Sequence, residues 1–538
     1  MTKVPNLLEI DMSKWEYNQQ DKTYYQLSIP YLKNPPDPHY NNLAIFVPDK
    51  YFKSQKNKDN KTYKCEINQS GKIGKLTPKN APIVFLVDTG GYMPCEPLKE
   101  YESQKDYTDK GLIYIHPGCR GRTHGAPSGI VDLKAAIRFL RKNKDILPGD
   151  TEKIFTFGMS GGGAQSAVLG ASGNANIFNG YFKKIGAVLN ERDDVYGSMC
   201  WCPVTGLDIG DEGYEWNLGC SRKDLDEEKS NFSKKLSEAY ASYINNLDLC
   251  DENGEKLSLE RSKDGIYQNG SYYNYVKNEI ERSFCNFIQD TKFPYNYEKS
   301  QEDHSKLGEK MKKMGGKKGG NAHEMKDKIN RVKIEPDIQI KGTYKNINDY
   351  LKALNSKVKW IEYDEKKKKA TITSISDYVK AMKPASKDIG AFDDLELSQG
   401  ENELFGLNNE KSHFDRFLKK IVKGTKYEKD FENDFKICDE MGHNMNLRVD
   451  MMTPLYYLIK RFPGYKKSKV APLWRIRSGL QQGDCALCTE INLALACKNY
   501  DGVKNVDFEM IWDQQHREAE RKGGVSYVNF IEWVLNNC

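Results

Sequence analysis

The chain of 538 residues is long enough for a large core and for roughly two to four domains. Its net charge of +6 is small beside 82 basic and 76 acidic residues, so charge gives no reason to expect a nucleic acid or a membrane as partner. No apolar run approaches the roughly 18–20 residues of a membrane-spanning helix. The first residues contain no apolar segment of a signal peptide, and we therefore expect a cytoplasmic protein.

The thirteen cysteines, an odd number without regular spacing, predict free thiols in a reducing compartment. The close pairs are Cys200 with Cys202 and Cys485 with Cys488. A structural zinc ion needs four ligands from paired clusters, so we interpret both pairs as buried thiols and expect no metal site.

The chain opens with two strand candidates, at residues 24–29 and 43–47, separated by a proline-rich turn. This order predicts the antiparallel beginning of a mixed sheet. The polar, lysine-rich residues 52–80 that follow are expected to form a surface hairpin or loop.

Strand and helix patterns then alternate. The continuous apolar runs at residues 81–87 and 112–115 are typical of strands buried on both faces. Helical periodicity follows at residues 130–141, then a short strand at 154–157, and a further strand region around residues 185–204. This alternation predicts a parallel sheet with helices on both of its faces.

The pattern dissolves between about residues 206 and 470, which are charged and rich in Tyr, Asn and Lys. Helical periodicity appears there only in patches, at residues 232–245 and 375–382. The glycine- and lysine-rich residues 312–328 are expected to form a mobile, solvated loop. They lack the interleaved aromatic residues of a site for single-stranded nucleic acid.

Sheet character returns at the end of the chain. Strands are predicted at residues 473–477 and 506–512, and helices at residues 489–497 and 525–535. We expect these elements to rejoin the sheet of the first half.

The central motif is Gly158-Met159-Ser160-Gly161-Gly162, placed between a predicted strand and a predicted helix. This is the G-x-S-x-G pattern of a nucleophile elbow, in which a strained turn lifts the serine hydroxyl off the sheet. Glycines are needed beside the serine because larger side chains would collide with the strand and the helix. We expect Ser160 to be the nucleophile of an acyl transfer.

Ser160 needs a base, because a serine hydroxyl is a weak nucleophile at neutral pH. His516 follows the last predicted strand, and Asp484 follows the strand before it. The order Ser160, Asp484, His516 is that of the α/β-hydrolases. We expect His516 to be the base and Asp484 to hold its ring, at about 2.6–3.2 Å from a ring nitrogen. Asp208, after the strand near residue 204, is the reserve acid.

The oxyanion of the tetrahedral intermediate needs two backbone donors. The first amide of the helix after the elbow, that of Gly161, points at the serine. The second donor is expected in the loop after residues 81–87, from the N–H of Gly91 or Tyr92.

These observations predict an α/β-hydrolase fold, with a mixed, mostly parallel sheet flanked by helices. Residues 1–205 and 465–538 are expected to form one discontinuous catalytic domain. Residues 206–464 are expected to form a lid or cap that packs over the edge of the sheet at Ser160.

At this point the chain resembles the bacterial tannase-type esterases, which are related to feruloyl esterases. The resemblance covers about residues 1–205 and 465–538 and extends into the insertion. It is carried by GMSGGGA at 158–164, GCRGR at 118–122, WRIR at 474–477, QH-x-x-AE at 515–520 and GENELFG at 400–406. It implies a serine hydrolase without cofactor that cleaves esters of phenolic or other small acids through an acyl-enzyme on Ser160.

Two departures from known tannases bear on the type of tannase that the chain resembles and on the role of Asp484. Fungal tannases carry cysteines beside the nucleophile and the histidine, whereas this chain has Met159 and Gln515 there. Bacterial tannases show Asp-x-Asp in the acid loop, one carboxylate for the triad and one for galloyl hydroxyls. Here the segment reads Gln482-Gly483-Asp484, so Asp484 is either the triad acid or a substrate ligand.

Two rival functions remain open. A serine peptidase or a general carboxylesterase of the same fold would use the same triad. A non-catalytic binding protein of this fold usually lacks the serine or the histidine, and both are present here. The expected partner is a small-molecule ester. The sequence does not define the substrate-binding residues or the oligomeric state.

Overall fold

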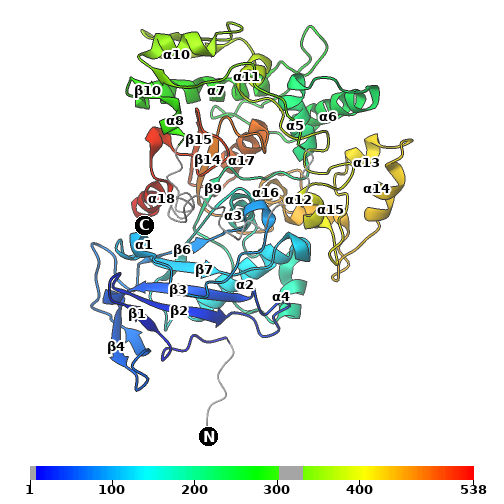
Figure 1. Ribbon diagram of the computed structural model, residues 1–538. Helices are drawn as coiled ribbons and strands as arrows, with labels where there is room; N and C mark the ends of the chain where they lie inside the picture. Colours follow the sequence, from blue (N-terminus) through cyan, green and yellow to red (C-terminus); the bar gives the residue numbers. More distant parts are fainter. Residues whose placement is uncertain (1–7, 302–330) are drawn as a thin grey trace.

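The computed structural model describes residues 8–301 and 331–538, and these are built around one nine-stranded sheet (Figure 1). Its strand order is β1-β2-β3-β7-β6-β8-β9-β14-β15. Strands β1 to β3 pair antiparallel and the others pair parallel, except where β3 meets β7. The bounds are β1 (Glu16–Asn18), β2 (Thr23–Pro30), β3 (Asn42–Pro48), β6 (Pro82–Leu86), β7 (Ile113–Pro117), β8 (Asp150–Met159), β9 (Gly197–Trp201), β14 (Leu473–Gly479) and β15 (Asn505–Ile511).

Helices cover both faces of this sheet, because apolar side chains of a strand such as β8 point alternately to one face and to the other. Ile154 of β8 belongs to the apolar core shared with α2, α3 and α17. Phe155 and Phe157 point to the opposite face, where their rings pack against Trp533 and Phe530 of α18. The bounds of these helices and of the short ones beside them are α1 (Lys105–Thr108), α2 (Ser128–Lys142), α3 (Gly161–Ala171), α4 (Asn179–Ile185), α17 (Leu487–Asn499) and α18 (Ser526–Asn536). The predicted α/β-hydrolase fold is confirmed.

The predicted elements of the catalytic region match the structure with one exception. In the region 185–204, where a strand was expected, α4 (Asn179–Ile185) ends, a loop of eleven residues follows, and β9 begins only at Gly197. The polar stretch after β3 forms the expected hairpin, from β4 (Phe52–Lys56) and β5 (Tyr63–Ile67).

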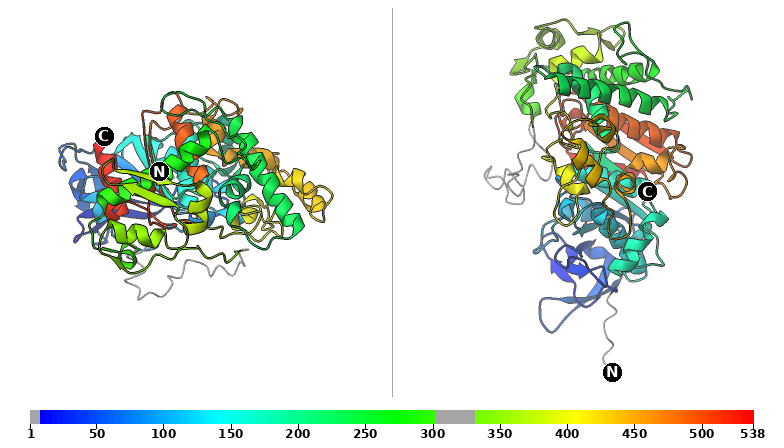
Figure 2. Two further views of the ribbon diagram at one scale, coloured as in Figure 1. Left: turned by 90° about the horizontal axis from the view of Figure 1, so that it is seen from above. Right: turned by 90° about the vertical axis from the view of Figure 1, so that its right-hand side faces the viewer.

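The insertion between β9 and β14 is mainly helical, and its far end lies opposite the N-terminal strands in the right-hand view of Figure 2. The predicted helix at 375–382 is α11, and the one at 232–245 begins earlier, at Glu227. The expected mobile segment at 312–328 lies outside the described residues. Helices of the insertion are α5 (Gly210–Leu218), α6 (Glu227–Asn245), α7 (Ser271–Asp290), α8 (Tyr297–Ser300), α10 (Ile347–Leu354), α11 (Ile375–Met382), α12 (Gly400–Phe405), α13 (Leu418–Ile421), α14 (Glu428–Asp434), α15 (Met445–Met451) and α16 (Pro454–Leu458); its strands are β10 (Tyr295–Asn296), β11 (Thr343–Tyr344), β12 (Ile361–Asp364) and β13 (Lys369–Ile372).

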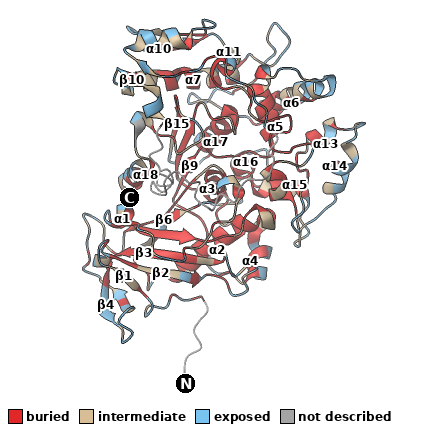
Figure 3. Ribbon diagram, viewed as in Figure 1, coloured by how far each residue is buried: buried red, intermediate tan, exposed pale blue. Residues whose placement is uncertain are grey.

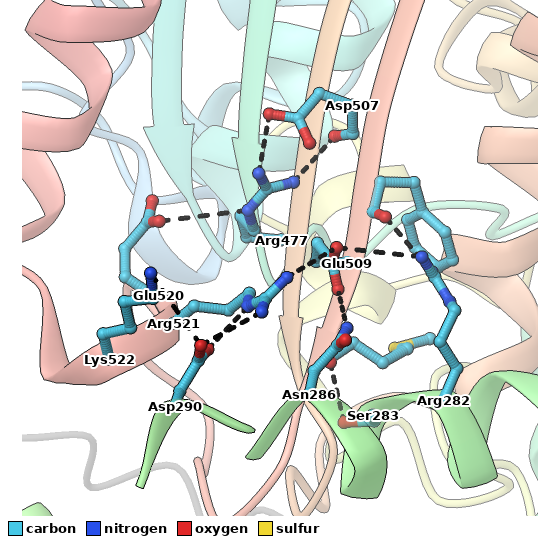
Figure 4. Close-up of polar contacts among 12 residues, drawn as sticks. Arg282, Ser283, Asn286, Asp290, Arg477, Asp507, Glu509, Glu520, Arg521 and Lys522 are labelled. Carbon is cyan, nitrogen blue, oxygen red and sulfur yellow. Dashed lines mark hydrogen bonds and ion pairs between the residues drawn. The ribbon is translucent and has the colours of Figure 1, made fainter. Parts of the chain in front are cut away.

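Helix α7 covers the last strand of the sheet, β15, whose outer edge has no strand partner in the described chain (Figure 4). Ser283 donates to the carbonyl of Met510 at 2.7 Å, and Arg282 donates to the carbonyl of Phe508 at 3.2 Å. Asn286 donates to the Glu509 carboxylate at 2.9 Å. The insertion therefore satisfies edge groups that would otherwise be open to a foreign strand.

The central strands are the most buried part of the molecule: all residues of β7, β9 and β14 are buried, whereas α10 and α14 of the insertion carry exposed positions (Figure 3). All thirteen cysteines are free. Among the described residues, no helix is long and apolar enough to cross a membrane, and no cluster of side chains has the makeup of a metal site.

Candidate active site

Ser160 occupies a strained turn between β8 and α3. Its backbone angles are φ 60° and ψ −123°, outside the regions that side chains normally adopt. The turn fits tightly: a Cβ at Gly162 would lie 2.1 Å from the carbonyl oxygen of Val87, and one at Gly158 would lie 2.5 Å from it. The glycines thus let α3 start against β6, and the turn presents the Ser160 hydroxyl above the sheet.

His516 lies in the loop after β15, and its Nε2 is 2.8 Å from Ser160 Oγ. This contact joins two residues that are 356 positions apart in the sequence. Nucleophile and base are therefore within hydrogen-bond distance, as general-base activation of a serine requires.

An anchor at Glu520 holds the loop of His516 in place. Its carboxylate accepts from Arg475 at 2.7 Å and from the indole N–H of Trp201 at 2.9 Å. Figure 4 shows the neighbouring pairs, in which Arg477 contacts both Glu520 and Asp507. The two motifs at 474–477 and 515–520 are thus one unit that fixes the base against β9, β14 and β15.

The second ring nitrogen of His516 has a different partner from the expected one. Nδ1 is 2.7 Å from Oε1 of Gln482, whereas the nearest Asp484 oxygen is 3.9 Å away. Asp484 instead accepts a hydrogen bond from Arg331 at 2.7 Å. The structure brings Ser160, His516 and Asp484 into one cluster, but the prediction that Asp484 hydrogen-bonds the ring is wrong, because Gln482 occupies that place.

Burial and nearby charges shift the pKa values of Asp484 and His516 so that the carboxylate is charged and the imidazole is neutral. Burial alone would raise the pKa of Asp484, but the positive charges of His516, Lys387 and Arg331 outweigh it and lower this pKa to about 2. Burial lowers the pKa of His516, Asp484 raises it, and Lys387 and Arg331 lower it further, so the net shift is downward. The imidazole is therefore neutral near pH 7 and able to accept a proton.

The oxyanion donors expected from the sequence lie together. A Cβ on Gly161 would be 2.5 Å from the Tyr92 nitrogen and 3.2 Å from the Gly91 nitrogen, so the two loops touch. The short helix η2 (Gly90–Tyr92) brings this loop to the elbow, with Gly91 at φ 60°. The Tyr92 N–H donates to the carbonyl of Thr89 at 2.8 Å. The N–H of Tyr92 is therefore already engaged within its own loop.

Asp208, the reserve acid, is buried elsewhere. Its carboxylate accepts from the hydroxyl of Tyr243 at 2.9 Å. Burial raises its pKa. In the part of the chain that the structure describes, it makes no hydrogen bond or ion pair with His516.

The insertion holds the loop that follows β14, residues 480–486, which we call the acid loop. Tyr378 donates to the carbonyl of Leu480 at 2.6 Å, Ser386 to that of Gly483 at 2.8 Å, and Lys383 to that of Cys485 at 2.6 Å. Three carbonyls of the acid loop therefore depend on residues 378–386.

The insertion also reaches the oxyanion loop. Helix α12 contacts η2 and η3 (Arg122–His124). Arg122 forms an ion pair with Glu403 of α12 at 2.8 Å and lies 3.4 Å from the carbonyl of Gly91. The sequence motifs at 118–122 and 400–406 therefore meet beside the predicted oxyanion donors.

Comparison with known proteins agrees with this geometry. The family model BD-FAE matches residues 74–199. The tannase of Fusobacterium nucleatum is 26% identical, with a TM-score of 0.69 over 98% of this chain and 99% of that one. A tannin acyl hydrolase in complex with 3,4-dihydroxybenzoate is 23% identical, with a TM-score of 0.69 over 99% of both chains. A tannase from Lactobacillus plantarum is 23% identical, with a TM-score of 0.68 over 96% of this chain and 95% of that one.

No curated protein matches the chain at a significant level. The resemblance to bacterial tannases that the sequence motifs indicated is confirmed by the solved structures, over nearly the whole chain.

Proposed function

We propose that this protein is a serine carboxylic-ester hydrolase of the tannase or feruloyl-esterase type. The observation that carries the proposal is the 2.8 Å contact between Ser160 Oγ and His516 Nε2 at a strained elbow. Ser160 attacks the ester carbonyl while His516 takes its proton, and the N–H groups of Gly161 and Gly91 receive the oxyanion. His516 then protonates the leaving alkoxide, which departs as the alcohol, and water hydrolyses the acyl-enzyme to release the acid.

Asp484 supplies the negative charge nearest to the imidazolium in this proposal. At 3.9 Å from Nδ1 it is too far for a hydrogen bond, but it is close enough to stabilise a positive ring. Its carboxylate, whose ionised form the cations Lys387 and Arg331 favour, can also accept hydrogen bonds from the hydroxyl groups of a phenolic acid. Both uses require the ionised form, and a pKa of about 2 keeps Asp484 ionised at neutral pH.

Residues 206–464 act as a lid in this proposal. The ion pair of Arg331 with Asp484 and the contacts of residues 378–386 with the acid loop support it, because both come from the insertion. The predicted substrate is a small ester, with no cofactor. The thirteen free cysteines support a reducing, cytoplasmic location.

The test is covalent labelling with a fluorophosphonate probe, followed by a hydrolysis panel. Wild-type protein is expected to be labelled and Ser160→Ala is not. The panel contains p-nitrophenyl acyl esters, methyl gallate, methyl ferulate and a dipeptide amide. Cleavage of the phenolic esters supports the proposal, whereas cleavage of the amide alone would favour a peptidase. Labelling that persists in Ser160→Ala would refute the assignment of the nucleophile.

A further inference from the structure

The partner of His516 Nδ1 is the side-chain amide of Gln482, and an amide can either donate or accept a hydrogen bond. The side chain of Gln482 carries an acceptor, Oε1, and a donor, Nε2, and exchanging them needs only a rotation. If Nε2 of Gln482 faced the histidine, Nδ1 of His516 would have to accept its hydrogen bond. The ring proton would then sit on Nε2 of His516. That tautomer could not take the proton of Ser160. Productive chemistry therefore needs a reason for Oε1 to face the ring.

Glu490 gives that reason. Nε2 of Gln482 donates to Oε1 of Glu490 and also to Ser478 Oγ, the latter at 2.6 Å. Ser478 in turn donates to the same Glu490 oxygen at 2.9 Å. Burial raises the pKa of Glu490, but Lys383 and the hydrogen bonds from Ser478 and Thr489 favour its ionised form. As a carboxylate, Glu490 only accepts hydrogen bonds, so the NH₂ group of Gln482 points at it. Oε1 is then the atom left for His516.

The network has no access to water that could replace its members. Gln482, Ser478 and Glu490 are each fully buried, with an exposed fraction of 0%. Glu490 lies in the first turn of α17, where the partial positive charge of a helix N-terminus favours a carboxylate. Its other oxygen accepts from Thr489 at 3.0 Å. A flipped Gln482 would set an amide oxygen against a carboxylate oxygen in a dry site, which is strongly unfavourable.

We propose that Gln482 and Glu490 form a positioning relay, which holds His516 in the tautomer that accepts the proton of Ser160. The inference rests on the proposed function and adds the residues that orient its base. As Ser160 Oγ bonds to the ester carbon, the hydroxyl proton of Ser160 moves to Nε2 of His516. The proton on Nδ1 stays there, donated to Gln482 Oε1, and the relay itself transfers no proton. When the intermediate collapses, the Nε2 proton passes to the leaving alkoxide.

The first test is Gln482→Met, which keeps the length of the side chain and removes both hydrogen-bonding groups. We expect kcat for p-nitrophenyl acetate to fall about 10²-fold with KM nearly unchanged, because the ring loses its fixed tautomer. Gln55→Met is the matched control, since Gln55 is exposed in the β4–β5 hairpin, outside the catalytic machinery. A Gln482→Met enzyme within about threefold of wild-type kcat would overturn the relay.

The second test exchanges the two partners. Glu490→Gln alone lets the amide of Gln482 turn either way, and kcat is expected to fall about tenfold. In the double variant Gln482→Glu/Glu490→Gln, a carboxylate faces His516 and an amide donates to it from behind. The number of charges and hydrogen bonds is conserved, so kcat is expected to recover to the wild-type level or above. A double variant no more active than Glu490→Gln alone would count against the relay.

A measurement on the wild-type protein keeps the inference testable if a variant fails to fold. The ¹⁵N NMR signals of the His516 ring, assigned by difference from His516→Asn, are expected to show a protonated Nδ1 and an unprotonated Nε2 above the pKa. The opposite tautomer would refute the relay. A protein with the expected tautomer that hydrolyses no ester in the panel would instead refute the proposed function, so the two failures are distinguishable.

Discussion

The nucleophile elbow and the acid loop meet at one histidine, but they are held in different ways. The elbow is shaped by backbone groups: Gly158 and Gly162 make room for the carbonyl of Val87, and the Ser160 N–H donates to the carbonyl of Trp201 at 2.9 Å. The acid loop is held by side chains of the insertion, with Tyr378 and Ser386 as donors to its carbonyls. The geometry of the elbow is therefore set by strands of the same sheet. The geometry of the acid loop is set by side chains of the insertion, a distant part of the chain.

The largest effect is expected from removing the nucleophile. Ser160→Ala should lower kcat by at least about 10⁴-fold, while the protein folds normally because the glycines support the turn. Steady-state kinetics and circular dichroism check this outcome. Residual activity above a few per cent of wild type would mean that another residue attacks the ester.

The elbow itself should tolerate no added methyl group. In Gly162→Ala the new Cβ would collide with the Val87 carbonyl at 2.1 Å, so α3 must shift. We expect kcat to fall about 10²-fold and the stability to fall by about 1–3 kcal/mol. Gly90→Ala is the control, because a Cβ there meets nothing within 4 Å. Equal behaviour of the two variants would contradict the steric account of the elbow.

A change at Asp484 should be smaller and visible in the pH profile. Asp484 raises the pKa of His516, so Asp484→Asn lowers it further below its usual value of 6.5. The acid limb of kcat/KM should therefore move to lower pH, with a loss of about 10–10²-fold at the plateau. Arg331→Gln removes a cation instead and should move the limb to higher pH. Shifts of the same sign in both variants would contradict this electrostatic picture.

The smallest effect is expected from loosening the acid loop. Tyr378→Phe/Ser386→Ala removes two hydroxyl donors to this loop and should lower kcat by about 3–10-fold. Amide hydrogen exchange in residues 480–486 should speed up, whereas exchange in residues 158–164 should not change. Tyr363→Phe, in the hairpin of β12 and β13, is the control. Faster exchange at the elbow as well would show that the two loops are not supported independently.

The same contrast explains what could be predicted from the sequence. The contact between Ser160 and His516 could be predicted, because both motifs are local and lie beside clear strand patterns. The orientation of the Gln482 amide could not be predicted, because it depends on burial and on the hydrogen bond to Glu490 in the first turn of α17. One signal was present: Glu490 is an acidic residue in the first turn of the mostly apolar helix α17, which indicates a buried partner.

Within the insertion, helix α7 was missed although its pattern was available. Tyr272, Val276, Ile280 and Phe284 recur at every fourth position and are all buried. The helix could have been found from this spacing alone. Its place along β15 could not, because single side-chain contacts such as that of Ser283 with Met510 fix it there.

The position of the insertion in the chain has a consequence for synthesis on the ribosome. Strand β9 ends at Trp201 and its partner β14 begins at Leu473, so 271 residues separate them. At about 5–20 residues per second, roughly 15–55 s pass before β14 is made. During this time β9, whose five residues are all buried in the finished protein, is the unpaired end of an incomplete sheet. Nascent chains of this protein should therefore depend on chaperones until the last 70 residues or so, roughly from β14 onward, emerge.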